Sequence, residues 1–190
     1  MSKQIIFPQK NKAEFLDVED AVLKPNQVKV KTIVSTISSG TERANITGDP
    51  TVSIESKPGC EAVFPRYSGY SASGIVVEKG EDVKNLEIGD RVAMYWSFHK
   101  TYNIVNEENA VKIENDNVSF EEAALAHIGT FPLAAIRKTK LEIGESLIVM
   151  GLGTLGLIAV QFARVAGAVP VIAVDPVKER REKALKFGAD

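Results

Sequence analysis

Residues 146–156 read Ser-Leu-Ile-Val-Met-Gly-Leu-Gly-Thr-Leu-Gly, and residues 157–165 continue Leu-Ile-Ala-Val-Gln-Phe-Ala-Arg-Val. The apolar run predicts a buried parallel strand, and the apolar residues after position 156 recur at helical spacing. Between strand and helix, Gly151 would permit a tight turn, Gly153 would let the backbone approach a pyrophosphate, and Gly156 would let the helix pack closely. The stretch therefore predicts a dinucleotide site.

The residues that follow this turn supply the rest of such a site. Thr154 and Leu155 would open the helix and offer unpaired N–H groups to an anion. A second apolar run ends in Asp175, 19 positions after the last glycine, where a ribose-binding carboxylate belongs. Its charge favours NAD over NADP, although Arg180 nearby would weaken that preference. The alternative is a glycine turn in another α/β protein that serves packing alone.

Composition bounds the class of protein. The 190 residues are 44% hydrophobic and 25% charged, with a net charge of −2, as in an ordinary soluble globular protein. No basic run predicts a nucleic-acid surface, and no segment is long and apolar enough to predict a membrane span or a signal peptide. We therefore expect a cytoplasmic protein. The single cysteine, Cys60, excludes a disulfide framework and a multi-cysteine zinc site.

The first two thirds of the chain predict a small β-barrel or sandwich. Short runs at 27–34, 69–77, 88–94, 102–105 and 110–113 have strand character and are separated by turn residues. Residues 43–68 contain many prolines and glycines and are expected to be mostly loop, with one helical turn near 43–46. His99 is expected to be an exposed strand residue.

The pattern then changes to helices and strands in alternation. Ser119 and Glu122 form a capping-box pattern before a helix at 121–126, and a second helix is predicted at about 131–138. A last helix is predicted from about 177 to 187, with Gly188 as its C-terminal cap. We expect a first domain over 1–126 and the start of a nucleotide-binding domain over 127–190.

Four motifs make this chain resemble the medium-chain dehydrogenase/reductase superfamily, the zinc alcohol dehydrogenases and their zinc-free relatives. The segment 39–42, Ser-Gly-Thr-Glu, resembles the family's C-G-T-D motif, and residues 69–80 resemble its G-H-E-x-x-G-x-V motif. Residues 89–92 match G-D-R-V, and residues 144–190 match its nucleotide domain. The resemblance implies an α/β plus β fold: a GroES-like β-barrel followed by a partial Rossmann doubly wound parallel sheet. It also implies an oxidoreductase with a small-molecule substrate.

Departures from the family pattern concern its zinc ligands. Ser39 stands where the family has a ligand cysteine, and Tyr70 stands where it has a ligand histidine. Neither side chain is a good neutral-pH zinc ligand, because a serine hydroxyl stays protonated and a phenol titrates near 10. His127, even with Glu42, leaves the site short of three good ligands. We therefore expect no zinc; a zinc-dependent alcohol or polyol dehydrogenase with unusual ligands is the alternative.

Chemistry without a metal would depend on three side chains. Thr41 corresponds to the family's proton-relay hydroxyl, Tyr70 could donate to a carbonyl or enolate oxygen, and His127 could act as base or orienter. The alternatives are that Thr41 bonds its own loop, Tyr70 fills space and His127 only ends a helix. Hydrogen bonds alone favour activated hydride acceptors such as conjugated ketones, quinones or enoyl groups.

The nucleotide domain is expected to be incomplete. A Rossmann sheet has about six strands, and only two are predicted here, so the resemblance implies a fragment of a protein of roughly 320–350 residues, and we expect the fragment itself to be inactive. The second strand would leave an open sheet edge, which predicts a homodimer. A non-catalytic nucleotide-binding module is the alternative from a different class.

Overall fold

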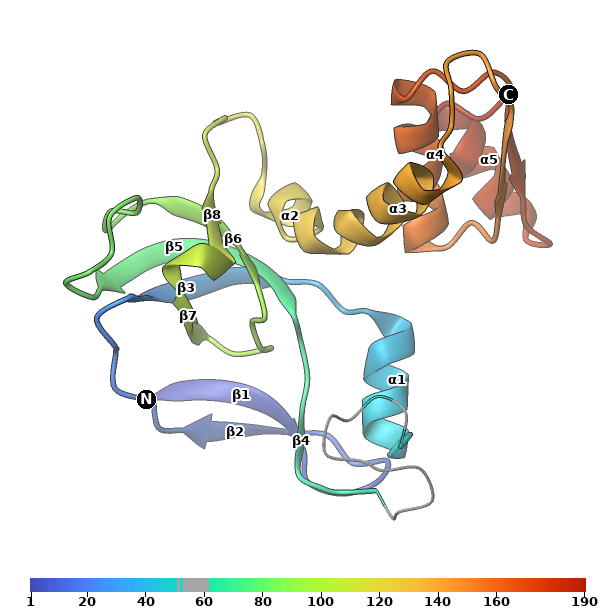
Figure 1. The fold of residues 1–190 in the computed structure, drawn as a ribbon. Helices are drawn as coiled ribbons and strands as arrows, with labels where there is room; N and C mark the ends of the chain where they lie inside the picture. The colour runs from blue at the N-terminus through green and yellow to red at the C-terminus, as the bar shows by residue number, and fades with distance from the viewer. Residues whose placement is uncertain (51, 53–61) are drawn as a thin grey trace. The chain divides into compact units, whose positions relative to one another are not determined.

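The computed structural model describes residues 1–50, 52 and 62–190 and divides into two compact units, Met1–His127 and Ile128–Asp190 (Figure 1). The division falls one residue after the boundary expected from sequence. It lies within a helix, not in a loop. Among the described residues, no helix is long and apolar enough to cross a membrane.

The first unit contains two antiparallel sheets. The smaller sheet has the order β2-β1-β4, and the larger has the order β7-β3-β5-β6-β8 and curls into a half-barrel. The small-sheet strands are β1 (Ser2–Phe7), β2 (Glu14–Val18) and β4 (Arg66–Tyr67). The large-sheet strands are β3 (Gln27–Ser35), β5 (Ser71–Lys79), β6 (Arg91–Tyr95), β7 (Tyr102–Asn106) and β8 (Ala110–Lys112), with a 3₁₀ turn at Glu107–Asn109.

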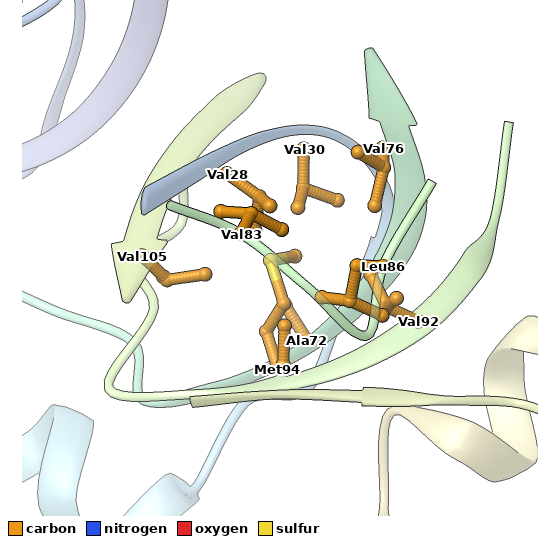
Figure 2. Packing of buried hydrophobic residues seen from close by; sticks show 10 residues of the cluster. Val28, Val30, Ala72, Val76, Val83, Leu86, Val92, Met94 and Val105 are labelled. Atoms are coloured by element: carbon orange, nitrogen blue, oxygen red, sulfur yellow. The ribbon is translucent and has the colours of Figure 1, made fainter. Parts of the chain in front are cut away.

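The larger sheet encloses an aliphatic core (Figure 2). Alternate residues of β3 and β6 point inward, so that Val28 and Val30 meet Val92 and Met94, all at most 1% exposed. Burying each such side chain contributes about 1.5–3 kcal/mol. The strands predicted from sequence therefore form because alternation places one apolar face on a shared core.

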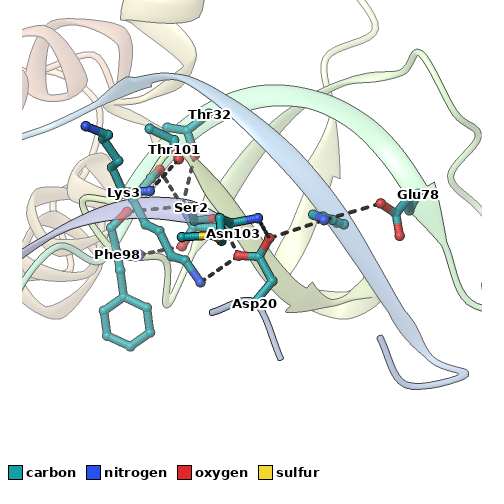
Figure 3. Close-up of polar contacts among 11 residues, drawn as sticks. Ser2, Lys3, Asp20, Thr32, Glu78, Phe98, Thr101 and Asn103 are labelled. Atoms are coloured by element: carbon teal, nitrogen blue, oxygen red, sulfur yellow. Dashed lines mark hydrogen bonds and ion pairs between the residues drawn. The ribbon is translucent and has the colours of Figure 1, made fainter. Parts of the chain in front are cut away.

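A network of charges closes the N-terminal end of this unit (Figure 3). The Asp20 carboxylate accepts a hydrogen bond from Ser2 and pairs with Lys29 at 3.3 Å and Lys100 at 3.1 Å. Burial tends to raise the pKa of Asp20, but the hydrogen bonds from Ser2, Lys100 and Lys29 outweigh it and lower the pKa to about 2. The carboxylate thus ties the N-terminal strand to β3 and to the segment before β7.

Helix α1 (Ser39–Thr47) is longer than the single turn predicted. It ends at Gly48, whose φ of 77° is left-handed and whose N–H bonds the Asn45 carbonyl. A Cβ at Gly48 would lie 2.8 Å from the Cβ of Ala62. This glycine is a normal helix stop signal, and the helix was underestimated because none of its residues is buried, so no apolar period marks it.

The segment after β8 contains two helices. The capping box is confirmed in α2 (Phe120–Ala123), where Ser119 and Glu122 bond each other's backbone N–H groups. The next helix, α3 (Ala126–Thr139), begins five residues earlier than predicted and contains Pro132. Its buried residues Ile128, Pro132 and Ile136 repeat every four positions, so packing of this face outweighs the hydrogen bond that proline cannot donate.

The second unit is built on a two-stranded parallel sheet. Strand β9 (Leu147–Met150) pairs with β10 (Val171–Val174), and helices α4 (Thr154–Val165) and α5 (Lys178–Lys186) follow them. Val149, Val160 and Val171 form the centre of its core. The opposite sheet face is exposed. Together the curled antiparallel sheet and the parallel strand–helix units confirm the α/β plus β fold class.

Candidate functional site

The glycine turn between β9 and α4 has an open backbone. Gly151 has a φ of 86°, in the left-handed region, so the chain reverses tightly there. A Cβ at Gly153 would meet nothing within 4 Å, whereas a Cβ at Gly156 would lie 1.9 Å from the Gly151 carbonyl oxygen. Position 156 therefore requires glycine for packing, and position 153 leaves space for an approaching group.

The N-terminus of α4 faces this open turn. The helix begins at Thr154, and its first backbone acceptor is the Gly153 carbonyl, which bonds the N–H of Leu157. The N–H groups of Thr154 and Leu155 therefore have no acceptor within the helix. The N-cap residue is Gly153, which has no side chain to cap them, so they are available to an anion.

Asp175 lies beside this turn at the end of β10. Its Oδ2 accepts the Leu152 N–H at 2.8 Å, and its Oδ1 accepts the Val177 N–H at 2.8 Å. The backbone hydrogen bond from Leu152, then that from Val177, lowers the pKa of Asp175, and Arg180 contributes from 3.5 Å. Asp175 is 6% exposed, and its Oδ2 is shared between Leu152 and Arg180, while its Oδ1 keeps one lone pair beyond the Val177 bond.

In the first unit, the structure brings Tyr70 and His127 together. Their ring centroids are 5.5 Å apart with an edge-to-face angle of 80°. Tyr95 stacks on His127 at 5.5 Å, and Trp96, 67% exposed, lies 6.2 Å from the same ring. Burial lowers the pKa of His127 from its usual 6.5, which favours a neutral imidazole at pH 7. The aromatic partners Tyr95 and Trp96 were not predicted from the sequence.

Thr41 lies in the first turn of α1. Its hydroxyl is 3.3 Å from that of Ser38. The next residue, Glu42, accepts the Gly69 N–H at 3.3 Å, which connects α1 to the residue before Tyr70. The segments that carry Thr41 and Tyr70 are thus joined by this hydrogen bond.

The donor set at the family's zinc positions does not fit zinc. Ser39 is exposed, and Tyr70 packs on an aromatic ring. Ser71, which follows, donates its hydroxyl to the Ala124 carbonyl at 2.6 Å. Within the described part of the chain, no three side chains of histidine, cysteine, aspartate or glutamate are grouped as metal ligands. Cys60 lies outside the described residues.

His99 is not the exposed strand residue that the sequence predicted. It is 7% exposed, and its ring bonds Ser35 through Nδ1 at 2.8 Å and Glu42 through Nε2 at 3.2 Å. These partners lie 64 and 57 positions away in the chain. No local pattern could have revealed this arrangement, because it depends on how the barrel closes.

The two units together define a class of dehydrogenase-like protein with a barrel followed by a nucleotide-type α/β unit. Residues 24–143 match the protein family described as "Alcohol dehydrogenase GroES-like domain", and residues 154–190 match the family described as "Zinc-binding dehydrogenase". The first match covers more than half of the chain. The chain therefore belongs to the GroES-like alcohol dehydrogenase family, within the medium-chain dehydrogenase/reductase superfamily.

Individual relatives agree with this family. The chain is 27% identical to D-guloside 3-dehydrogenase of Escherichia coli, over 99% of this chain and 58% of that protein. It is 30% identical to (R,R)-butanediol dehydrogenase of Bacillus subtilis, over 90% of this chain and 57% of that protein. A solved quinone oxidoreductase from Pseudomonas syringae superposes with a TM-score of 0.82 at 25% identity, over 100% of this chain and 57% of that one. The chain thus spans somewhat more than half the length of these relatives.

Proposed function

We propose that this chain is the barrel and first nucleotide-binding half of an NAD(H)-dependent oxidoreductase that works without catalytic zinc. In the complete protein, the reaction is hydride transfer between NAD(H) and a carbonyl, alcohol or activated alkene. The observation that carries the proposal is the open turn at Gly153, beside unpaired N–H groups and the Asp175 carboxylate. These groups suit a pyrophosphate and an adenosine ribose. The bound nicotinamide supplies or accepts the hydride.

The roles of the first unit follow from the chemistry of its side chains. Tyr70 donates a hydrogen bond to the substrate oxygen, and Thr41 contributes its hydroxyl to proton transfer. His127, held neutral by burial and packed against Tyr70, orients the phenol or accepts its proton. Hydrogen bonds polarise a carbonyl less than a metal does, which favours conjugated ketones, quinones or enoyl groups as acceptors.

Nucleotide titration tests the cofactor half of the proposal. NADH fluorescence enhancement, or calorimetry, should detect binding by the wild-type chain, with NADPH bound more weakly because Asp175 opposes a 2′-phosphate. Gly153→Val should keep the fold, because the space around its Cβ is open and the φ of −75° suits any residue, but should weaken binding at least tenfold. Equal affinity of wild type and variant would reject the pyrophosphate assignment.

Metal analysis tests the zinc half. The alternative function is a zinc-dependent alcohol or polyol dehydrogenase with unusual ligands. The match of residues 154–190 to a family of zinc-binding dehydrogenases favours this alternative. Purification with added zinc, followed by elemental analysis, should give far less than one zinc per chain. A stoichiometric zinc that is lost in Tyr70→Phe would replace the metal-free proposal with the alternative.

The assembly is also a proposal. Both edges of the two-stranded sheet are open in the described structure, and Ile148, Met150, Ile172 and Val174 expose a paired apolar face. These features favour a homodimer. The proposed partners otherwise are a small-molecule substrate and neither nucleic acid nor membrane, and the proposed location is the cytoplasm. Sedimentation that shows only monomer at high concentration would reject the dimer.

The alternative from a different class is a non-catalytic module. Such a module would bind NADH, yet a complete version of the protein would show no turnover on any activated carbonyl or alkene.

A further inference from the structure

Three polar side chains of the first unit, Ser35, His99 and Glu42, are linked in a chain by hydrogen bonds, and none of them takes part in the contacts of the His127 ring described above. Ser35, at the end of β3, is 2.8 Å from His99 Nδ1, and His99 Nε2 is 3.2 Å from Glu42 Oε1. The His99 side chain is 6% exposed and that of Glu42 is 14% exposed. A hydroxyl, an imidazole and a carboxylate in this order are the arrangement that activates a nucleophile.

The hydrogen bonds fix the proton positions in this chain. An ionised carboxylate only accepts hydrogen bonds, and Glu42 Oε1 also takes the N–H of Gly69 at 3.3 Å. His99 must therefore carry its proton on Nε2. In the neutral ring, Nδ1 then has a free lone pair that accepts the hydroxyl proton of Ser35. Glu42 Oε2 is buried and has no hydrogen-bond partner in the described structure. His99 is therefore the one side chain there that the Glu42 carboxylate bonds.

A groove of about 210 Å³ gives access to the nucleophile end of this chain. Both Ser35 and His99 line it, and Ser35 is partly exposed. Its other lining residues are three apolar side chains and three polar ones, Ile5, Phe15, Ile33, Thr32, Lys100 and Thr101. The volume suits an acyl group of a few carbons.

Two hydroxyls in the same groove remain able to donate. Thr32 Oγ1 accepts a hydrogen bond from the Asn103 amide at 2.9 Å, and Thr101 Oγ1 accepts the Lys3 N–H at 2.9 Å. Each hydroxyl therefore has its own proton left for an oxygen in the groove. Donors of this kind stabilise the oxyanion that forms when a hydroxyl attacks an ester.

We propose that Ser35, His99 and Glu42 form a nucleophilic site that hydrolyses short-chain carboxylic esters, independent of the oxidoreductase function. The Ser35 Oγ attacks the ester carbonyl while its proton passes to His99 Nδ1. The ester C–O bond then breaks, and the leaving alcohol takes that proton. Water attacks the acyl-Ser35 ester, His99 again accepts and returns a proton, and the carboxylic acid leaves.

Labelling of the wild-type chain tests the nucleophile directly. A small alkyl fluorophosphonate should form a Ser35 Oγ–P bond with loss of fluoride, and tandem mass spectrometry should find the added mass at Ser35 in the tryptic peptide Thr32–Arg43. p-Nitrophenyl acetate should be hydrolysed faster than the p-nitrophenyl octanoate ester, because the groove is small. A label found only on other residues, with none on Ser35, overturns the proposal.

Variants separate this chemistry from unspecific reaction of surface groups. Ser35→Ala should abolish labelling and reduce acetate ester hydrolysis about a hundredfold, and Glu42→Gln should reduce both at least tenfold by removing the charge that orients His99. Ser146→Ala, at an exposed serine of the second unit, is the matched control and should leave both rates unchanged. Circular dichroism should show that each variant is folded. A folded Ser35→Ala variant with wild-type hydrolysis overturns the proposal.

Discussion

Replacing Asp20 with asparagine should destabilise the first unit in a manner that depends on pH. The Asp20 carboxylate is 13% exposed. It accepts a hydrogen bond from Ser2 and pairs with Lys29 and Lys100, and these contacts together lower its pKa from 3.8 to about 2. Asparagine can still accept from Ser2 but lacks the charge that both lysines neutralise. The substitution therefore removes the part of the folding free energy that depends on ionisation.

The magnitude follows from the two pKa values. A carboxylate whose pKa is lower in the folded state stabilises that state above the unfolded pKa, and the stabilisation is lost as pH falls through the folded pKa. A shift of nearly two pH units corresponds to about 2.5 kcal/mol at pH 7, falling to about 1.3 kcal/mol at pH 3. Asp20→Asn should therefore lose about 2 kcal/mol at pH 7 and about half as much at pH 3.

Urea unfolding followed by tryptophan fluorescence measures this loss. Trp96 is the only tryptophan in the chain and lies in the same unit as Asp20, so its emission reports the unfolding of that unit. Glu19→Gln, at the exposed neighbouring acid, is the matched control and should change stability by less than about 0.5 kcal/mol. A loss for Asp20→Asn that is the same at pH 3 and pH 7 would refute the electrostatic reasoning.

Three further predictions concern single positions. Gly156→Ala should lower the melting temperature of the second unit by several degrees, since its Cβ would lie 1.9 Å from the Gly151 carbonyl oxygen, whereas Gly153→Ala should change it little; equal effects would contradict the packing argument. Ser71→Ala removes a 2.6 Å hydrogen bond to a carbonyl after α2 and should cost about 1–2 kcal/mol in urea unfolding, and a neutral result would contradict a role in anchoring that helix. His127 should titrate below pH 6.5 by NMR because burial disfavours its charged form, and a midpoint at or above 6.5 would show that the ring is solvated.

Sequence patterns succeeded where the relevant interactions are local. The turn at Gly151, the packing position Gly156 and the capping box at Ser119 each depend on residues a few positions apart, so spacing alone identifies them. The strands of the barrel alternate because one face is buried. The fold class follows from these local signals.

Patterns failed where distant parts of the chain meet. His99 was placed on the surface because its neighbours in sequence say nothing about Ser35 or Glu42. Tyr70 and His127 were both candidates, but only the folded barrel adds Tyr95 and Trp96 around the imidazole. The glycine turn could be predicted from spacing, whereas the composition of the aromatic cluster could not.

The bonds made by Asp175 change how an experiment on that acid should be interpreted. The carboxylate accepts hydrogen bonds from the backbone N–H of Leu152, inside the glycine turn, and from that of Val177, just before α5. Truncation to alanine would release both segments before any nucleotide is added. Weakened affinity in such a variant would combine a displaced glycine turn with the loss of the proposed ribose contact. Asparagine can still accept a hydrogen bond from one of those two N–H groups. Comparing the alanine and asparagine variants therefore separates the effect on the structure of the turn from the effect on nucleotide binding.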